Sequence, residues 1–338
     1  MGIEELINEA ESIRRANGID AAVGFYTAQI QRESNTEFGE QNGDLLAQLY
    51  NEMGFYKRIK KDFDGALKDY VFGLSWSSNN EIVAKININK ADSLRFLGRL
   101  EEAHKSIDSA ISYARKKVDN LIWAKAARQK GLIFVKEEKF AKALKQYLVA
   151  KNVIDDQINY EAVSSGQVHL EEMISPKTLR VKAEVLEPLG ELYVRMGDVS
   201  KAKEAYALFK ESLDISLKLD NEQNIVNAVR GLGKVAMMTG KPVEAIPHYE
   251  TAWNILQKTQ YGRSITTTAL LLAEAHLANN EPEKAKPYLE RFLDDMRKLK
   301  LQDADNDHRK PHFENVLKYL SNSGLQIEKF EEVADLFA

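Results

Sequence analysis

The sequence predicts an all-α protein made of about seven antiparallel helix pairs, and three observations carry this prediction. Small and aromatic residues recur in one frame along most of the chain, the frame returns about every 40 residues, and its apolar positions have helical spacing. A period of this size is typical of repeat proteins, whose units bury their apolar faces only by stacking on their neighbours.

The repeating frame is clearest around Gly54, which is followed by Ala66 twelve residues later and by Tyr70 four residues after that. Seven positions begin such a frame, with glycine at 54, 131, 190 and 233 and alanine at 10, 91 and 273. In the fifth copy the matching aromatic residue is expected to be Tyr206. Since glycine costs about 1 kcal/mol relative to alanine in a helix interior, its recurrence predicts a close approach by the neighbouring helix.

Residues that favour helix ends agree with this frame. Gly197 and Gly240 stand where a helix end requires left-handed backbone, and Ser175 and Asp198 stand where a side chain can accept hydrogen bonds from free N–H groups. Pro242 is expected in the first turn of a helix, where its missing N–H is tolerated. Each repeat is therefore expected to contain two helices joined by a short polar turn.

One step of the array is longer than the others and predicts a break. The frame positions 131 and 190 are 59 residues apart, whereas the other steps are 37 to 44 residues. The predicted parts are 1–154 with repeats one to four, 155–175 as an irregular insertion, 176–300 with repeats five to seven, and 301–338 as a pair of capping helices. A continuous array with one irregular repeat is the alternative.

Composition excludes several classes of function. The formal net charge of −4 argues against nonspecific nucleic-acid binding, which needs clustered Lys and Arg. An acidic N-terminus and the lack of an 18-residue apolar run predict a cytoplasmic protein that does not enter a membrane. The chain has no cysteine, so it has no disulfide, thiol nucleophile or thiolate zinc site. No catalytic, cofactor or metal site is predicted, and the protein is not expected to be an enzyme.

The frame resembles the tetratricopeptide repeat (TPR). The resemblance rests on Tyr50, Met53, Gly54, Ala66 and Tyr70 in the second repeat and on Val229, Leu232, Gly233, Ala245, Tyr249 and Ala252 in the sixth. A period near 40 residues, instead of 34, is similar to the long-repeat branch of this family. The resemblance implies a right-handed superhelical solenoid whose first helices line a concave groove. It also implies a non-enzymatic interaction module or scaffold that binds a peptide or an extended protein segment there.

Carrying the family's groove positions over to this sequence gives a set of amide, charged and aromatic side chains in first helices. The candidates are Asn51, Phe55, Lys85, Asn89, Lys125, Arg128, Gln129, Glu187, Glu191, Asn227, Arg230 and Lys234. Asparagine amides donate and accept hydrogen bonds with a peptide backbone, and Lys125 and Arg128 pair with carboxylates, so a partner with acidic groups is expected. The family's clamp for chaperone tails is matched only at Asn89 and Lys125, which disfavours that partner.

Two other functions compatible with the resemblance stay open. One is a peptide-responsive signalling regulator similar to bacterial pheromone receptors. The other is a structural scaffold that assembles with copies of itself, for which the apolar C-terminal segments could supply contacts, so a homo-oligomer is a further possibility.

Overall fold

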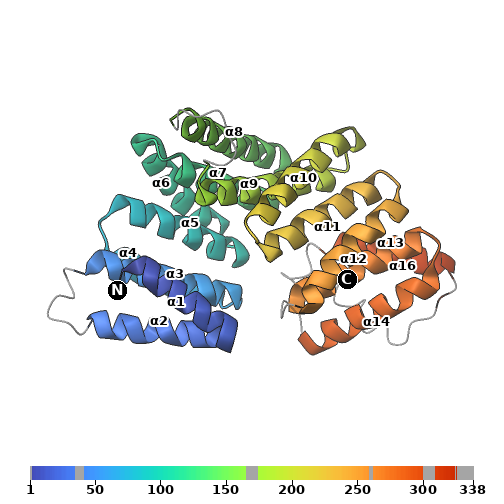
Figure 1. The fold of residues 1–338 in the computed structure, drawn as a ribbon, viewed down its shortest axis with the longest axis horizontal. Helices are drawn as coiled ribbons and strands as arrows, with labels where there is room; N and C mark the ends of the chain where they lie inside the picture. Colours follow the sequence, from blue (N-terminus) through green and yellow to red (C-terminus); the bar gives the residue numbers. More distant parts are fainter. Residues whose placement is uncertain are drawn as a thin grey trace. The chain divides into compact units, whose positions relative to one another are not determined.

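The computed structural model describes residues 2–34, 42–164, 174–258, 262–299, 309–323 and 325. These residues form fifteen α-helices and one short 3-10 helix, and they contain no strand. Figure 1 shows successive helices lying side by side within each part of the chain. The predicted all-α architecture of stacked helix pairs is confirmed.

The first fourteen helices form seven pairs. The first helices of the pairs are α1 (Ile3–Asn17), α3 (Gly43–Ile59), α5 (Asn80–Phe96), α7 (Asn120–Lys136), α9 (Pro176–Arg195), α11 (Glu222–Met238) and α13 (Gly262–Ala278). The second helices are α2 (Ile19–Ser34), α4 (Phe63–Trp76), α6 (Leu100–Lys117), α8 (Phe140–Ser164), α10 (Ala202–Lys218), α12 (Pro242–Lys258) and α14 (Pro282–Leu299). The helix α16 (Lys310–Ser323) packs on α13.

The chain divides into two compact units, residues 1–174 (unit 1) and 175–338 (unit 2). In both units the two helices of a pair pack on each other, and the second helix also packs on the first helix of the next pair. In unit 1 each first helix also contacts the next first helix. This stacking places side chains that are one repeat apart within reach of one another.

A buried aromatic ring from each of several second helices fills the space beside a small residue of the first helix. Tyr70 lies against Gly54, and Tyr249 lies against Gly233, with both rings almost fully buried. In the fifth pair the ring against Gly190 is Phe209, whereas Tyr206 is 47% exposed. The prediction of Tyr206 was wrong because a 3-10 helix over residues 199–201 precedes α10 and shifts the buried frame by three residues.

The predicted helix ends are largely confirmed. Oγ of Ser175 accepts a hydrogen bond from the Thr178 N–H at 3.1 Å, and Asp198 caps the 3-10 helix. Gly197 and Gly240 have φ of +67° and +72°, in the left-handed region where glycine is favoured. The helix α12 begins at residue 242, as the proline predicted.

Between frame positions 131 and 190, the helix α8 is longer than the sequence predicted. The helix α8 continues to Ser164, so the predicted insertion at 155–175 begins as helix. A hydrogen bond of 3.2 Å from Asn120 Nδ2 to Gln157 Oε1 ties this extension to the start of α7. Of the predicted capping pair, α16 is described and buries Phe313 beside Phe292, whereas residues 326–338 lie outside the described residues.

Candidate functional site

The first helices α3, α5 and α7 form what we call the first-helix face of unit 1. Side-chain amides donate two hydrogen bonds between neighbouring helices on this face. Nδ2 of Asn89 donates to Oδ1 of Asn51 at 2.9 Å. Nε2 of Gln129 donates to Oδ1 of Asp92 at 2.8 Å. Three of the predicted groove residues are therefore joined across adjacent helices, at separations of 38 and 37 residues that match the repeat.

Asp92 is the charged centre of this face. Its carboxylate also accepts hydrogen bonds from Arg58 Nη1 and Arg95 Nη2, both at 2.7 Å. Burial alone would raise the pKa of Asp92, but the charges of Arg95 and Arg58 outweigh burial and hold it well below its ordinary range. The sequence-based prediction omitted both arginines, although each stands four residues after a frame-starting position. Arg58 lies on α3 and joins it to α5 through this carboxylate, whereas Arg95 lies on α5 itself, three residues after Asp92.

Glu52 is a second carboxylate on this face that the sequence-based prediction omitted. Its Oε1 accepts a hydrogen bond from Asn51 Nδ2 at 3.1 Å. Burial raises the pKa of Glu52, and the Asn51 hydrogen bond and the charges of Lys125 and Lys85 oppose that rise. The two predicted lysines are therefore close enough to Glu52 to act on it electrostatically.

The other predicted residues of unit 1 supply cations and one aromatic ring. Lys85 is exposed and forms an ion pair of 2.5 Å within α5. Lys125 and Arg128 are half-buried on α7. The guanidinium of Arg58 lies over the ring of Phe55, 5.1 Å from its centroid. Amides, cations and the partly buried carboxylates of Glu52 and Asp92 thus share one face. This combination can hydrogen-bond a peptide backbone and pair with charged groups.

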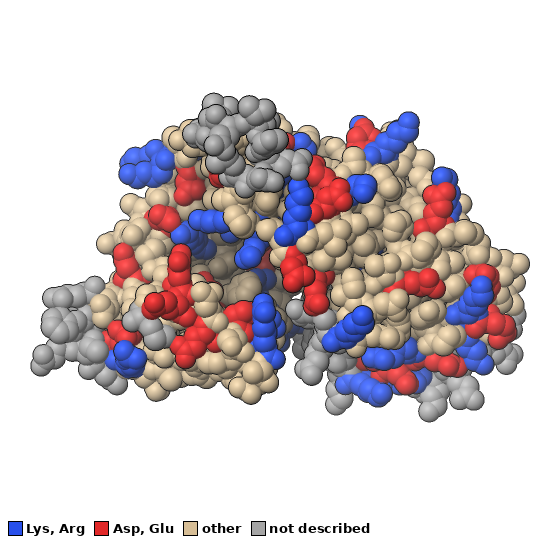
Figure 2. Space-filling model, viewed as in Figure 1, with Lys and Arg blue, Asp and Glu red and all other residues tan. Residues whose placement is uncertain are grey.

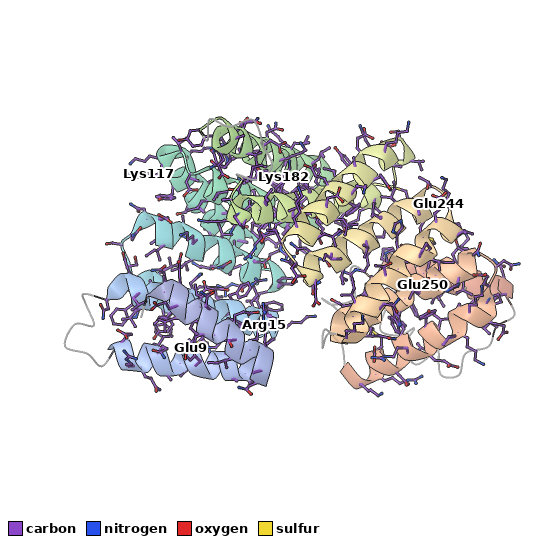
Figure 3. All side chains as sticks on the ribbon, in the orientation of Figure 1. Glu9, Arg15, Lys117, Lys182, Glu244 and Glu250 are labelled. Atoms are coloured by element: carbon purple, nitrogen blue, oxygen red, sulfur yellow. The ribbon has the colours of Figure 1, made fainter. Side chains whose placement is uncertain are left out.

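The helix α1 adds a saturated carboxylate beside this face. Glu11 accepts hydrogen bonds from Arg14 at 2.6 and 2.7 Å, from Arg15 at 3.1 Å and from the Tyr56 hydroxyl at 3.1 Å. Figure 3 labels Arg15 near the C-terminal end of α1. The Arg14 hydrogen bond is the main reason that the pKa of Glu11 falls to about 2.

Tyr26 is the buried neighbour of Tyr56, with ring centroids 5.7 Å apart. Its side chain is fully buried, and its hydroxyl has no hydrogen-bond partner among the described residues. Burial and then the negative charge of Glu52 raise the pKa of Tyr26 far above its ordinary value.

In unit 2 the predicted groove residues of α9 and α11 pair with one another. Nδ2 of Asn227 donates to Glu187 at 3.2 Å, and Nη2 of Arg230 donates to Asn227 Oδ1 at 2.8 Å. Lys234 Nζ lies 2.7 Å from Glu191 Oε1, and this lysine outweighs burial so that the pKa of Glu191 is lowered. Burial lowers the pKa of Arg230. Figure 2 shows acidic and basic side chains intermingled over the visible face.

Glu274 on α13 is a buried carboxylate that the sequence-based prediction also omitted. Its oxygens lie 2.6 Å from His312 Nδ1 and 2.6 Å from Asn315 Nδ2, both on α16. Glu274 is 4% exposed, so these two side chains satisfy a carboxylate that water hardly reaches. The pairing continues the pattern in which polar groups about one repeat apart meet.

The described part of the chain contains no cluster of His, Asp and Glu that could hold a metal ion. Within the same residues, no helix is long and apolar enough to span a bilayer.

Comparisons with known proteins agree with this architecture. A family profile described as "Tetratricopeptide repeat" matches residues 84–117, which cover most of α5 and α6. No curated protein sequence matches the chain.

Three solved structures of the Rap group share the fold. The apo form of RapI has a TM-score of 0.57 at 11% identity, covering 89% of this chain and 99% of that chain. A Rap regulator of conjugation genes on plasmid pLS20, in complex with the Phr* peptide, has a TM-score of 0.60 at 14% identity, covering 86% and 72%. A Rap protein complexed with competence and sporulation factor has a TM-score of 0.54 at 14% identity, covering 99% of both chains.

The described chain thus has a TPR-like fold of stacked helix pairs, and the α5–α6 pair itself matches the tetratricopeptide repeat.

Proposed function

We propose that this protein is a cytoplasmic binding module whose first-helix face in unit 1 takes an extended peptide or protein segment bearing an acidic group. The observation that carries the proposal is the Asn89–Asn51 amide pair, which joins α3 to α5. The helix α5 in turn contacts α7, the helix that carries Lys125 and Arg128. Asn89 uses Nδ2 within the pair, and no described residue donates to its Oδ1, which can accept an N–H from a ligand. Lys125 and Arg128 can then pair with a carboxylate.

The size of the face supports a short extended ligand. Neighbouring packed helices are about 8–10 Å apart, so three first helices span about 20 Å. An extended chain rises about 3.3 Å per residue, so about six residues would cross this face. The Phr* peptide and the competence and sporulation factor, bound by two proteins of the same fold, are consistent with peptide binding.

The test is a pull-down from host lysate with three versions of the full chain. The first is wild type, and the second carries K85A, K125A and R128A. The third carries K105A, K116A and K117A, which removes the same charge from exposed positions of the second helix α6. Lys117 of this control set is labelled in Figure 3.

We expect mass spectrometry to identify a peptide or protein that is retained by wild type and by the K105A, K116A, K117A control. The K85A, K125A, R128A variant should lose it. Melting temperatures of the three proteins should agree within a few degrees, which separates lost binding from lost folding. Equal retention by all three versions would refute the proposed face.

A second candidate function is a peptide-responsive regulator. It is favoured by the fold shared with the Rap regulator of conjugation genes, which was solved with its peptide bound. A regulator of this kind should change shape on binding, so small-angle scattering with and without a retained peptide should give different curves. Identical curves would contradict the regulator and favour a binding module that does not change shape.

A further inference from the structure

An open cavity of about 600 Å³ lies in unit 1 between the second helices α6 and α8. The helix α7 packs on both of them (Figure 1). One side of the cavity is formed by α6, and the other by Lys130 of α7 and Gln146 of α8. None of the lining residues is a groove candidate of the first-helix face, so the cavity is a separate place on the molecule. Its volume is in the range of about 300–1,000 Å³ that small-molecule sites have.

Five residues of α6 line the cavity, and they lie on one face of the helix. They follow one another at intervals of three, one, three and one residues, which keeps side chains on the same side of a helix. In order they are Asp108, Ile111, Ser112, Arg115 and Lys116. This face therefore offers the cavity an acid, an apolar side chain, a hydroxyl and two cations.

Two positive charges at the cavity are not neutralised by a described acid. Nζ of Lys130 lies 2.6 Å from Oδ1 of Asp108, so the charges of these two residues cancel. No described carboxylate forms an ion pair with Arg115 or Lys116. The guanidinium of Arg115 instead lies over the ring of Trp123, 5.1 Å from its centroid, and this contact restricts its position.

A purely structural role explains part of this arrangement. Basic residues in the last turn of a helix stabilise it by offsetting the helix dipole, and Arg115 and Lys116 stand in the last turn of α6. That role needs neither a cavity beside them nor a third basic residue from another helix. The convergence of Lys130 on the same cavity is therefore the observation that points to a ligand.

We propose that this cavity binds a small organic phosphate, a function that goes beyond peptide binding by the first-helix face. A phosphate monoester carries about 1.5–2 negative charges near pH 7, which matches the charge left on Arg115 and Lys116. The planar guanidinium can donate two parallel hydrogen bonds to it, and the ammonium a third. The Ser112 hydroxyl and the Gln146 amide add neutral donors. Ile111 and the remaining volume receive the organic part.

Isothermal titration of the full chain in a low-salt buffer free of phosphate tests this inference, because salt screens exposed charges. The probe is phenyl phosphate. Benzenesulfonate has the same ring and a tetrahedral group with a single charge, and inorganic phosphate lacks the ring. The cavity variant carries R115Q and K116Q. Its matched control carries K105Q and K117Q, which removes two charges from exposed positions of α6 that do not line the cavity.

We expect wild type to bind phenyl phosphate saturably and severalfold more tightly than benzenesulfonate or inorganic phosphate. The R115Q, K116Q variant should bind it about tenfold more weakly, because two exposed ion pairs are lost. The K105Q, K117Q control should bind it as wild type does, and so should the K85A, K125A, R128A variant of the first-helix face. Circular dichroism should show the same helix content in all four proteins.

Several results would overturn the inference. Titrations of wild type without saturable binding would refute the cavity as a site, and equal weakening in both α6 variants would reduce it to general charge attraction. A loss confined to the K85A, K125A, R128A variant would place the anion on the first-helix face. Benzenesulfonate or inorganic phosphate that binds as tightly as phenyl phosphate would refute an organic phosphate as the ligand.

These results are independent of the proposed function. Peptide retention in the pull-down depends on Lys85, Lys125 and Arg128, none of which lines the cavity. The K105A, K116A, K117A control of that experiment changes one cavity residue and no residue of the first-helix face, so it still serves as the control for peptide binding. Either proposal can therefore fail while the other stands.

Discussion

A β-carbon placed on Gly54 would lie 2.6 Å from Cε1 of Tyr70, a separation that real side chains do not adopt. Tyr70 is fully buried on α4, so its ring has no room to retreat. The same relationship joins Gly233 to Tyr249. The recurrent glycine therefore makes space for an aromatic ring of the paired helix, and this contact repeats along the array.

The first prediction is that G54A destabilises the protein while G24A stabilises it. Alanine gains about 1 kcal/mol of helix propensity at either site. At Gly54 the overpacking against Tyr70 costs about 1–3 kcal/mol and outweighs that gain. At Gly24, in α2, a β-carbon would meet nothing within 4 Å, so only the gain is left. Urea unfolding followed by circular dichroism measures both, and a higher midpoint for G54A than for wild type would contradict the packing argument.

The second prediction concerns two adjacent tyrosines. Y56F removes a hydroxyl that donates to the Glu11 carboxylate at 3.1 Å, and should lower the free energy of unfolding by about 1–2 kcal/mol. Y26F removes a buried hydroxyl that has no described partner, so the free protein should be unchanged or more stable by up to about 1 kcal/mol. Thermal unfolding of both variants without ligand is the measurement. Equal losses would show that the Tyr26 hydroxyl does have a partner.

The repeated pattern was sufficient to predict the helix pairs and most of their ends, because these depend on residues close together in the sequence. Ser175 and Gly240 each act through a few neighbouring backbone groups, and both have the predicted roles. The fifth pair is the exception. There the 3-10 helix places Phe209 instead of Tyr206 in the buried position. The surrounding sequence does not indicate this shift of three residues.

The polar contacts of the candidate site were harder to predict, because each depends on how neighbouring pairs stack. The sequence-based prediction placed Asn51 and Asn89 on one face but did not identify them as partners. It omitted Glu52, since a glutamate on a helix is usually solvated, whereas in the fold burial raises the pKa of this carboxylate. Separations close to one repeat, such as 38 residues between Asn51 and Asn89, were a signal that could have been used.

The third prediction is a stability change in acid that depends on Glu11. Its pKa in the folded protein is about 2, mainly because of Arg14, and its ordinary value is 4.5. A carboxylate with a lowered pKa stabilises the fold above pH 4.5 and loses this contribution as the pH falls toward 2. Because Glu11 is about one third exposed, solvent screening reduces the contribution to about 1 kcal/mol.

Melting temperatures measured from pH 7 to pH 2 test this dependence. The difference between wild type and E11Q should be largest above pH 4.5 and should close as the pH approaches 2. E9Q removes a carboxylate from an exposed position of the same helix, labelled in Figure 3, and serves as the matched control. A difference between wild type and E11Q that stays constant with pH would show that Glu11 acts through packing instead of charge.

The fourth prediction is that Glu274 couples α16 to α13 through Asn315. The Asn315 amide lies 2.6 Å from a carboxylate that is 4% exposed, so N315A should leave that oxygen short of a partner and cost about 1–2 kcal/mol. In an E274A background the same substitution should cost little, since the acceptor is gone. The coupling energy of this double-mutant cycle should be about 1–2 kcal/mol.

N322A, on the same helix but bonded only to a backbone carbonyl of α16, is the control and should show no coupling to E274A. Hydrogen exchange of the α16 amides is the measurement, because it reports the opening of this helix separately from unit 1. Equal effects of N315A with and without Glu274 would mean that apolar contacts such as Phe313 on Phe292 hold α16, and that the buried carboxylate contributes nothing to its docking.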